Sequence, residues 1–150
     1  MKKLILLFLS LSLIVTLFSC KREESAYDML SEFISVYGAE GVIYAPRISE
    51  GNEGYISAGL IEKIFIYSGR LPDNYAVFLN SRTADFAECG IFVCDDTDSL
   101  LNIEEMCRER VKLLTGGGKY GFVKLSGMTV FYSCLQDRER AEKIWREIIR

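Results

Sequence analysis

The spacing of hydrophobic positions along this 150-residue chain predicts a helix near its beginning. Five apolar side chains recur at steps of three and four residues: Met29, Leu30, Phe33, Ile34 and Tyr37. Ser25 and Asp28 have the spacing of a capping box in front of this pattern, and Gly38 ends it. We therefore expect an amphipathic helix that begins just after Ser25.

A short strand and a second helix should follow. The apolar run Val42–Ala45 stops at Pro46, and residues 47–55 form a polar stretch rich in glycine. Ser57 stands where it can cap a helix that carries Leu60, Ile61, Ile64, Phe65 and Tyr67, and Gly69 follows as the expected end.

From residue 74 the pattern changes to strands alternating with longer helices. Strands are expected at 75–79, 89–94, 120–125 and 128–134, and helices at 99–114 and 139–149. The strands are apolar on both faces, which suggests that the two N-terminal helices cover the second face. The predicted fold class is α+β, with a mainly antiparallel sheet, a ββαββα C-terminal arrangement and two preceding helices after an N-terminal signal helix.

The N-terminus carries the clearest functional pattern in the chain. Lys2 and Lys3 precede an apolar run from Leu4 to Phe18, and Ser19 stands directly before Cys20. The run is shorter than the roughly 20 residues of a spanning helix, and the segment resembles a bacterial lipoprotein signal that ends in a lipobox. An uncleaved signal anchor and a plain secretory signal are the alternatives.

The lipobox resemblance implies that Cys20 becomes the first mature residue, linked to diacylglycerol and N-acylated, so that palmitate-type chains hold the protein in a membrane. The expected parts are a signal peptide at 1–19, the lipidated Cys20 with a short tether at 20–24, and one domain at 25–150. The tether residues 21–24 reach about 14 Å when extended, so the domain should stay close to the membrane on its extracytoplasmic face.

A wider resemblance covers most of the chain. The lipobox, the strand at Val42, the Gly-containing loop, the helix at Ser57, the Tyr75–Phe78 strand and the terminal strand-helix units together look like a family of small bacterial lipoproteins with a domain of unknown function. The resemblance implies a topology and a location in the cell envelope. It brings no activity and no site residues.

Charge narrows the choice of partners. Loss of Lys2 and Lys3 lowers the 18 basic side chains to 16 against 21 acidic ones, which gives the mature chain a formal charge of −5. A nucleic-acid partner is excluded because such a protein needs a basic surface, and an anionic bilayer would repel this domain. The lipid on Cys20 must therefore anchor the protein, with an envelope protein as the expected partner.

Four cysteines follow Cys20: Cys89, Cys94, Cys107 and Cys134. All four stand in apolar strand or helix patterns, where a free thiol behaves as a small hydrophobic group. We expect buried free thiols. The alternative is at least one disulfide, with Cys94 and Cys134 as the favoured pair because each ends a candidate strand.

Little in the sequence indicates catalysis. There is no histidine, which removes histidine-based nucleophile pairs and histidine-ligated metals. The run Asp95–Asp98 could hold Ca²⁺, but Thr97 or Asp98 is better explained as the N-cap of the next helix. Gly116–Gly118 follow a helix rather than precede one, so they predict a helix exit and no phosphate loop. No cofactor or metal is expected.

The predicted function is that of a non-catalytic binding or accessory domain held at a membrane. The alternative is a small-ligand binder or weak enzyme with a pocket near Asp95 or Tyr55. Tyr55 is the aromatic residue chosen as an exposed binding candidate, because it lies in the polar, glycine-rich loop.

Overall fold

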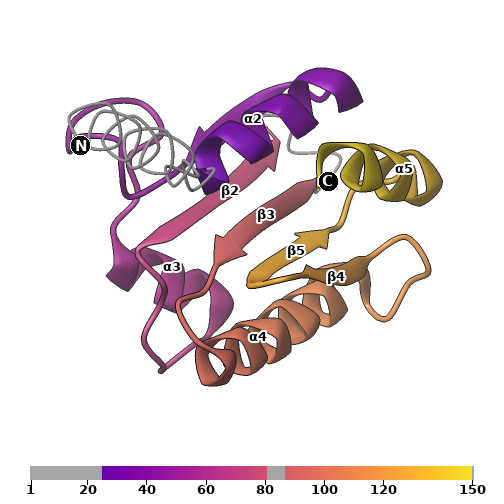
Figure 1. The fold of residues 1–150 in the computed structure, drawn as a ribbon. Coiled ribbons are helices and arrows are strands. Elements are labelled where there is room, and N and C mark those ends of the chain that lie inside the picture. Colours follow the sequence, from indigo (N-terminus) through magenta and orange to yellow (C-terminus); the bar gives the residue numbers. More distant parts are fainter. Residues whose placement is uncertain (1–24, 81–86, 150) are drawn as a thin grey trace, which may run out of the picture.

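A five-stranded antiparallel sheet with helices on both faces organises the structure, a computed structural model that describes residues 25–80 and 87–149 (Figure 1). The α+β class predicted from the sequence is confirmed. The elements run in the order α2 (Ala26–Tyr37), β1 (Gly41–Tyr44), α3 (Ala58–Phe65), β2 (Asn74–Asn80), β3 (Glu88–Val93), α4 (Thr97–Thr115), β4 (Phe122–Ser126), β5 (Thr129–Ser133) and α5 (Arg138–Ile148). The predicted signal helix lies outside the described residues.

The strand order in the sheet is β1-β2-β3-β5-β4. Two antiparallel pairs, β2 with β3 and β4 with β5, are joined at the centre where Gly90 pairs with Tyr132. The Tyr132 ring covers Gly90 so closely that a Cβ there would lie 2.6 Å from the ring. The glycine therefore makes room for the aromatic residue at the middle of the sheet.

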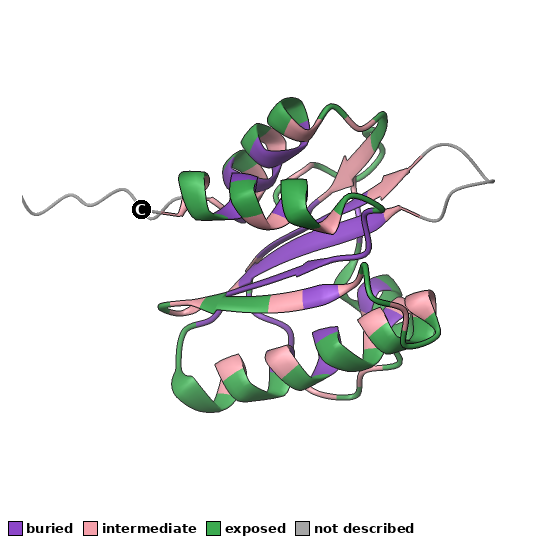
Figure 2. Cartoon of the chain, turned by 90° about the vertical axis from the view of Figure 1, so that its right-hand side faces the viewer, coloured by how far each residue is buried: buried purple, intermediate pink, exposed green. Residues whose placement is uncertain are grey.

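The two faces of the sheet bury separate cores (Figures 1 and 2). On one face, α2 and α5 enclose Phe33, Phe131 and Trp145, with the Trp145 and Phe131 rings stacked at 4.3 Å between centroids. On the other face, α3 and α4 enclose Phe65, Phe92 and Tyr132. The apolarity of both strand faces is thus explained, because no face of the central strands meets water.

The placement of the N-terminal helices differs from the prediction. The two helices do not cover the second face together. Helix α2 packs beside α5, and α3 packs beside α4 on the opposite face. Helix α3 is also shorter than expected, because Ile66 adopts the left-handed conformation at φ 53° and ends the helix before Gly69.

The starts of α2, α3 and α4 differ from the prediction. At α3, Ser57 is the N-cap, but its side chain makes no cap hydrogen bond. Ser25 is the N-cap of α2, but its hydroxyl accepts a hydrogen bond from Arg47 Nη1 at 2.7 Å instead of closing a capping box. Arg47 also binds both oxygens of Asp28, at 2.9 and 3.2 Å. At α4 the N-cap is Asp96, whose Oδ1 accepts from the Ser99 N–H at 2.7 Å, so neither Thr97 nor Asp98 has this role. At α5 Asp137 accepts from the Arg140 N–H at 3.0 Å.

Candidate functional site

The start of the described domain is fixed at one end of the sheet. The Ala26 N–H donates to Asn74 Oδ1 at 2.9 Å, and Asn74 begins β2 and pairs with Val93, the last residue of β3. The predicted lipidation residue, Cys20, lies outside the described residues. Ser25 therefore lies at the end of the sheet where Asn74 and Val93 pair, and we call this end the tether end. The turns around Asp95 and Gly127 lie at the same end.

The aspartates at the tether end line a cavity of about 270 Å³. Asp95, Asp96 and Asp98 share its wall with Arg70 and Tyr67. Asp96 is occupied as the N-cap of α4. Within residues 25–80 and 87–149, no group of three or more His, Cys, Asp or Glu side chains is arranged to hold a metal ion. The cavity is therefore a small polar recess, and its carboxylates are spread over its wall.

Tyr55 is half-buried, whereas the sequence predicted an exposed side chain. Its backbone forms an isolated parallel bridge with Ala45, and the Ala45 N–H donates to the Gly54 carbonyl at 2.9 Å. The glycine-rich loop thus folds back along the outer side of β1. Behind it, the hydroxyl of Tyr75 is buried without a hydrogen-bond partner among the described residues. Burial, with smaller effects from Glu62 and Tyr55, raises the pKa of Tyr75 to about 12.

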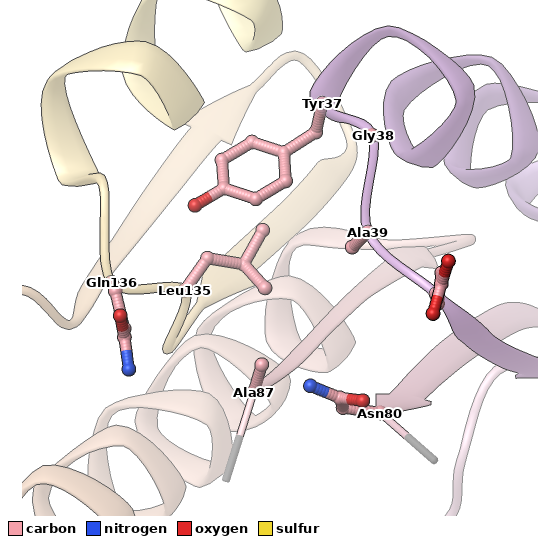
Figure 3. Close-up of a pocket in the computed structure, with 8 residues that line it drawn as sticks. Tyr37, Gly38, Ala39, Asn80, Ala87, Leu135 and Gln136 are labelled. Carbon is pink, nitrogen blue, oxygen red and sulfur yellow. The ribbon is translucent and has the colours of Figure 1, made fainter. Parts of the chain in front are cut away.

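A second cavity, of about 320 Å³, lies at the opposite end of the sheet (Figure 3). Tyr37 and Leu135 form its apolar side, and polar side chains line it from Gln136, which follows Leu135, and from Asn80 at the end of β2. The Tyr37 hydroxyl accepts a hydrogen bond from the Asp137 N–H at 3.2 Å, and burial raises its pKa. The site joins the end of α2 to the start of α5. This cavity could not be predicted from the sequence, because its residues come from four separate segments.

A charged cluster is buried under the sheet on the α4 side. Arg110 donates to Glu88 through Nε at 2.8 Å and Nη2 at 2.6 Å, and through Nη1 to the Ile64 carbonyl at 2.9 Å. The Tyr132 hydroxyl donates to the same carboxylate at 2.8 Å. The Arg110 guanidinium also lies 5.4 Å from the centre of the Phe65 ring. The cluster therefore connects α3, β3, α4 and β5 through one carboxylate.

The electrostatics of this cluster indicate a structural role. Burial, reinforced by the negative charge of Glu88, raises the pKa of Tyr132 well above its usual range. Burial lowers the pKa of Arg110, but the hydrogen bonds and the negative charge of Glu88 outweigh this effect, so the pKa is raised above its usual value. Tyr132 is thus a neutral donor, Arg110 is a permanent cation, and the carboxylate is held between them. Neither Tyr132 nor Arg110 therefore releases its proton near neutral pH.

The four described cysteines are free and buried, as the sequence predicted. The alternative bridge between Cys94 and Cys134 is wrong, because β3 and β5 are antiparallel. Val93 pairs with Thr129 and Cys89 with Ser133, which places the two thiols at opposite ends of the strand pair. Burial raises the pKa of Cys134 to about 12 and of Cys89 and Cys107 well above 9.0, so these thiols stay protonated and unreactive.

A groove runs between β4, an outer strand of the sheet, and helix α5. Lys124, Leu125 and Ser126 of β4 line it together with Glu142, Trp145 and Arg146 of α5. Its volume is about 280 Å³. Lys124 Nζ lies 3.7 Å from Glu142 Oε2, and Arg138 Nε lies 2.9 Å from Glu142 Oε1. Burial alone would raise the pKa of Glu142, but Arg138 and Lys124 lower it, so the carboxylate remains ionised.

Comparisons with known proteins found no relative of this chain. No family model, no curated protein and no solved structure matches the chain. Among the described residues, the helices are all too short or too polar to cross a membrane. The function must therefore be argued from the N-terminal sequence and from the geometry of the domain.

Proposed function

We propose that the chain is a membrane-anchored, extracytoplasmic lipoprotein whose domain is a non-catalytic binding or accessory module. The observation that carries this proposal is the order Lys2-Lys3, apolar run, Ser19-Cys20, with the first helix of the domain starting at Ala26. A diacylglyceryl group on Cys20, joined by N-acylation, gives the two or more chains that stable anchoring requires.

The position of Ser25 supports a defined orientation for the anchored domain. The Ala26–Asn74 bond and the Arg47–Asp28 pair fix the start of α2 at the tether end. Helix α2 has 12 residues, and a rise of about 1.5 Å per residue carries the chain roughly 18 Å to Tyr37. The cavity beside Tyr37 would then open away from the bilayer, where a partner could reach it.

The chemistry of the described side chains supports a binding role over catalysis. The most buried carboxylate, Glu88, is held by Arg110 and Tyr132, and the thiols have raised pKa values. The Glu88 carboxylate is thus already paired, and the buried thiols of Cys89, Cys107 and Cys134 are held in their protonated, weakly nucleophilic form. An accessory role needs only a stable surface that is held at the right place.

Metabolic labelling with a palmitate analogue tests the anchor. The wild-type chain should take up the label, and Cys20→Ser should lose it and leave an unprocessed precursor, because the diacylglyceryl transfer requires a thiol. Ser19→Ala is the matched control, since alanine keeps a small residue before the cleavage point and should keep the label. Equal labelling of the wild type and Cys20→Ser would refute the proposal.

The second candidate is a small-ligand binder that uses the cavity beside Asp95. The observation in its favour is a recess of about 270 Å³ that is lined by Arg70 and three aspartates. Calorimetric titration with Ca²⁺ separates the two functions. Saturable heat in the micromolar range that disappears in the Asp95→Asn, Asp98→Asn double variant would favour the ligand binder. A flat titration supports the accessory module.

A further inference from the structure

The two outer edges of the sheet differ in how they are protected. The edge of β1 is followed by the loop 47–55, which returns along it; a Cβ at Gly54 would lie 2.6 Å from the Ile43 carbonyl oxygen. The other edge, β4, faces the viewer in Figure 2 between α5 above and α4 below. No described strand or loop pairs with its outer side. Strand β4 is therefore the open edge.

The register of the β4–β5 hairpin shows which backbone groups face outward. Gly127 and Met128 form a two-residue turn, with Gly127 at φ 54°, and Ser126 pairs with Thr129. In such a hairpin the residues next to the turn exchange hydrogen bonds, and the pattern then alternates. Phe122, Lys124 and Ser126 thus bond to β5. The N–H and C=O groups of Val123 and Leu125 point away from the sheet.

The side chains along this edge have two distinct characters. Lys124 lies on the α5 face, where Arg146 lines the same groove and Arg138 lies 5.4 Å from the centre of the Phe122 ring. The single carboxylate among them, Glu142, already binds Arg138 and lies near Lys124. On the α4 face, Val123 is half-buried and Leu125 is 43% exposed. One face is cationic and the other is aliphatic, although the whole chain is acidic.

A second copy of this chain does not fit the edge well. In an antiparallel pairing of β4 with itself that uses all five residues, Lys124 would lie directly opposite its own copy. Directly opposed side chains in a sheet have Cβ atoms about 4.5–5.5 Å apart, and like charges at this distance are destabilising. A lysine on an edge strand commonly prevents such self-pairing. A strand with an acidic residue at that position would instead be attracted.

We propose that β4 binds an extended acidic peptide segment of a partner protein, which adds a sixth strand to the sheet. The inference rests on the binding role proposed above and specifies the partner. Aliphatic residues of the segment pair with Val123 and Leu125 on the α4 face. Acidic residues between them lie opposite Lys124 and Phe122, within reach of Arg146 and Arg138. Backbone hydrogen bonds supply affinity, and the alternating side chains supply specificity.

The probe is the peptide acetyl-Val-Glu-Val-Glu-Val-amide, titrated into the full-length chain in detergent. Trp145 is the only tryptophan and lines the groove, so its emission reports binding. Slower hydrogen exchange at the Val123 and Leu125 amides should accompany the change in emission. The matched peptide with lysine in place of glutamate should bind at least about tenfold more weakly, because opposed like charges disfavour the pairing.

Two variants separate backbone pairing from side-chain effects. Leu125→Pro removes an outward N–H while the β4–β5 ladder keeps its hydrogen bonds, and it should reduce affinity for the acidic peptide about tenfold or more. Leu125→Ala keeps the N–H and controls for the lost side chain. Lys124→Glu should reverse the preference between the two peptides. Unchanged thermal unfolding temperatures would establish that each variant is folded.

Several results would overturn the inference. Equal affinity for the two peptides would show that charge complementarity does not select the peptide. Wild-type affinity in Leu125→Pro would show that the peptide does not pair with the backbone of β4. Self-association that is lost in Leu125→Pro, measured by sedimentation, would identify a second copy as the occupant. Failure of lipid labelling at Cys20 bears only on the anchor, because peptide binding at β4 is measured independently of it.

Discussion

The substitution Arg110→Met tests how the buried cluster stabilises the domain. The side chain of Arg110 is 13% exposed and that of Glu88 is 7% exposed, and the two share a bidentate ion pair. Methionine has a similar length and is apolar, so it should fill the space between α3 and α4. The Glu88 carboxylate would then keep only the Tyr132 hydroxyl as a side-chain partner.

The expected cost follows from that uncompensated charge. Breaking a buried ion pair by removing one partner typically destabilises a protein by 3–5 kcal/mol, and we expect about 4 kcal/mol here. Tyr132→Phe should cost less, about 1–2 kcal/mol, because Glu88 Oε1 still accepts from Arg110 Nε. The double variant Glu88→Gln, Arg110→Met should recover at least half of the single-variant loss, since it contains no unpaired buried charge.

Urea and thermal unfolding followed by circular dichroism measure these differences. For a domain of this size, a loss of about 4 kcal/mol corresponds to a fall of roughly 10–20 °C in the unfolding temperature. The reasoning fails if Arg110→Met costs less than about 1 kcal/mol. It also fails if the loss of stability in the double variant equals the sum of the losses in Arg110→Met and Glu88→Gln measured separately. The two charges would then be energetically independent.

The remaining predictions concern the helix caps and the thiols. Asp96→Ala should destabilise the domain by about 1 kcal/mol because the Ser99 N–H loses its acceptor, whereas Asp98→Ala should have little effect; urea unfolding measures both. Alkylation in denaturant without reductant should add four labels to Cys89, Cys94, Cys107 and Cys134, and two or fewer would reveal disulfides. Because burial raises the pKa of Cys134 from 9.0 to about 12, the free energy of unfolding should be level below about pH 8.5 and should fall as pH rises above it, when the unfolded thiols ionise. A Cys134→Ala variant should lose part of that decline.

The elements of the domain were largely predictable because their signals are local. Alternating and three-to-four spacings located every described helix and strand to within a few residues. Errors arose where a distant partner decided the outcome. Arg47, 22 residues away in the sequence, donates a hydrogen bond to the Ser25 hydroxyl, which was predicted to form a capping box. Strand direction, which also depends on contacts across the fold, placed Cys94 and Cys134 apart.

The sites were harder to predict because their residues come from several elements. One signal was nevertheless present for the buried cluster. Arg110 continues the spacing of Ile103, Met106 and Cys107 on the buried side of α4, and a cation at such a position needs a buried anion. The open edge of β4 could not be predicted in this way, since edge position depends on the strand order of the whole sheet.

The pairing of helices across the sheet has a consequence for how the chain acquires its structure. The first helix, α2, buries Phe33 against Phe131 of β5 and shares a core with Trp145 of the last helix. An N-terminal fragment that lacks residues 122–148 would leave α2 without this partner surface, and the central strand β3 without one neighbour. The domain thus lacks an independently folding N-terminal half. Stable structure therefore forms only when nearly all of the described residues, from α2 to α5, are present together.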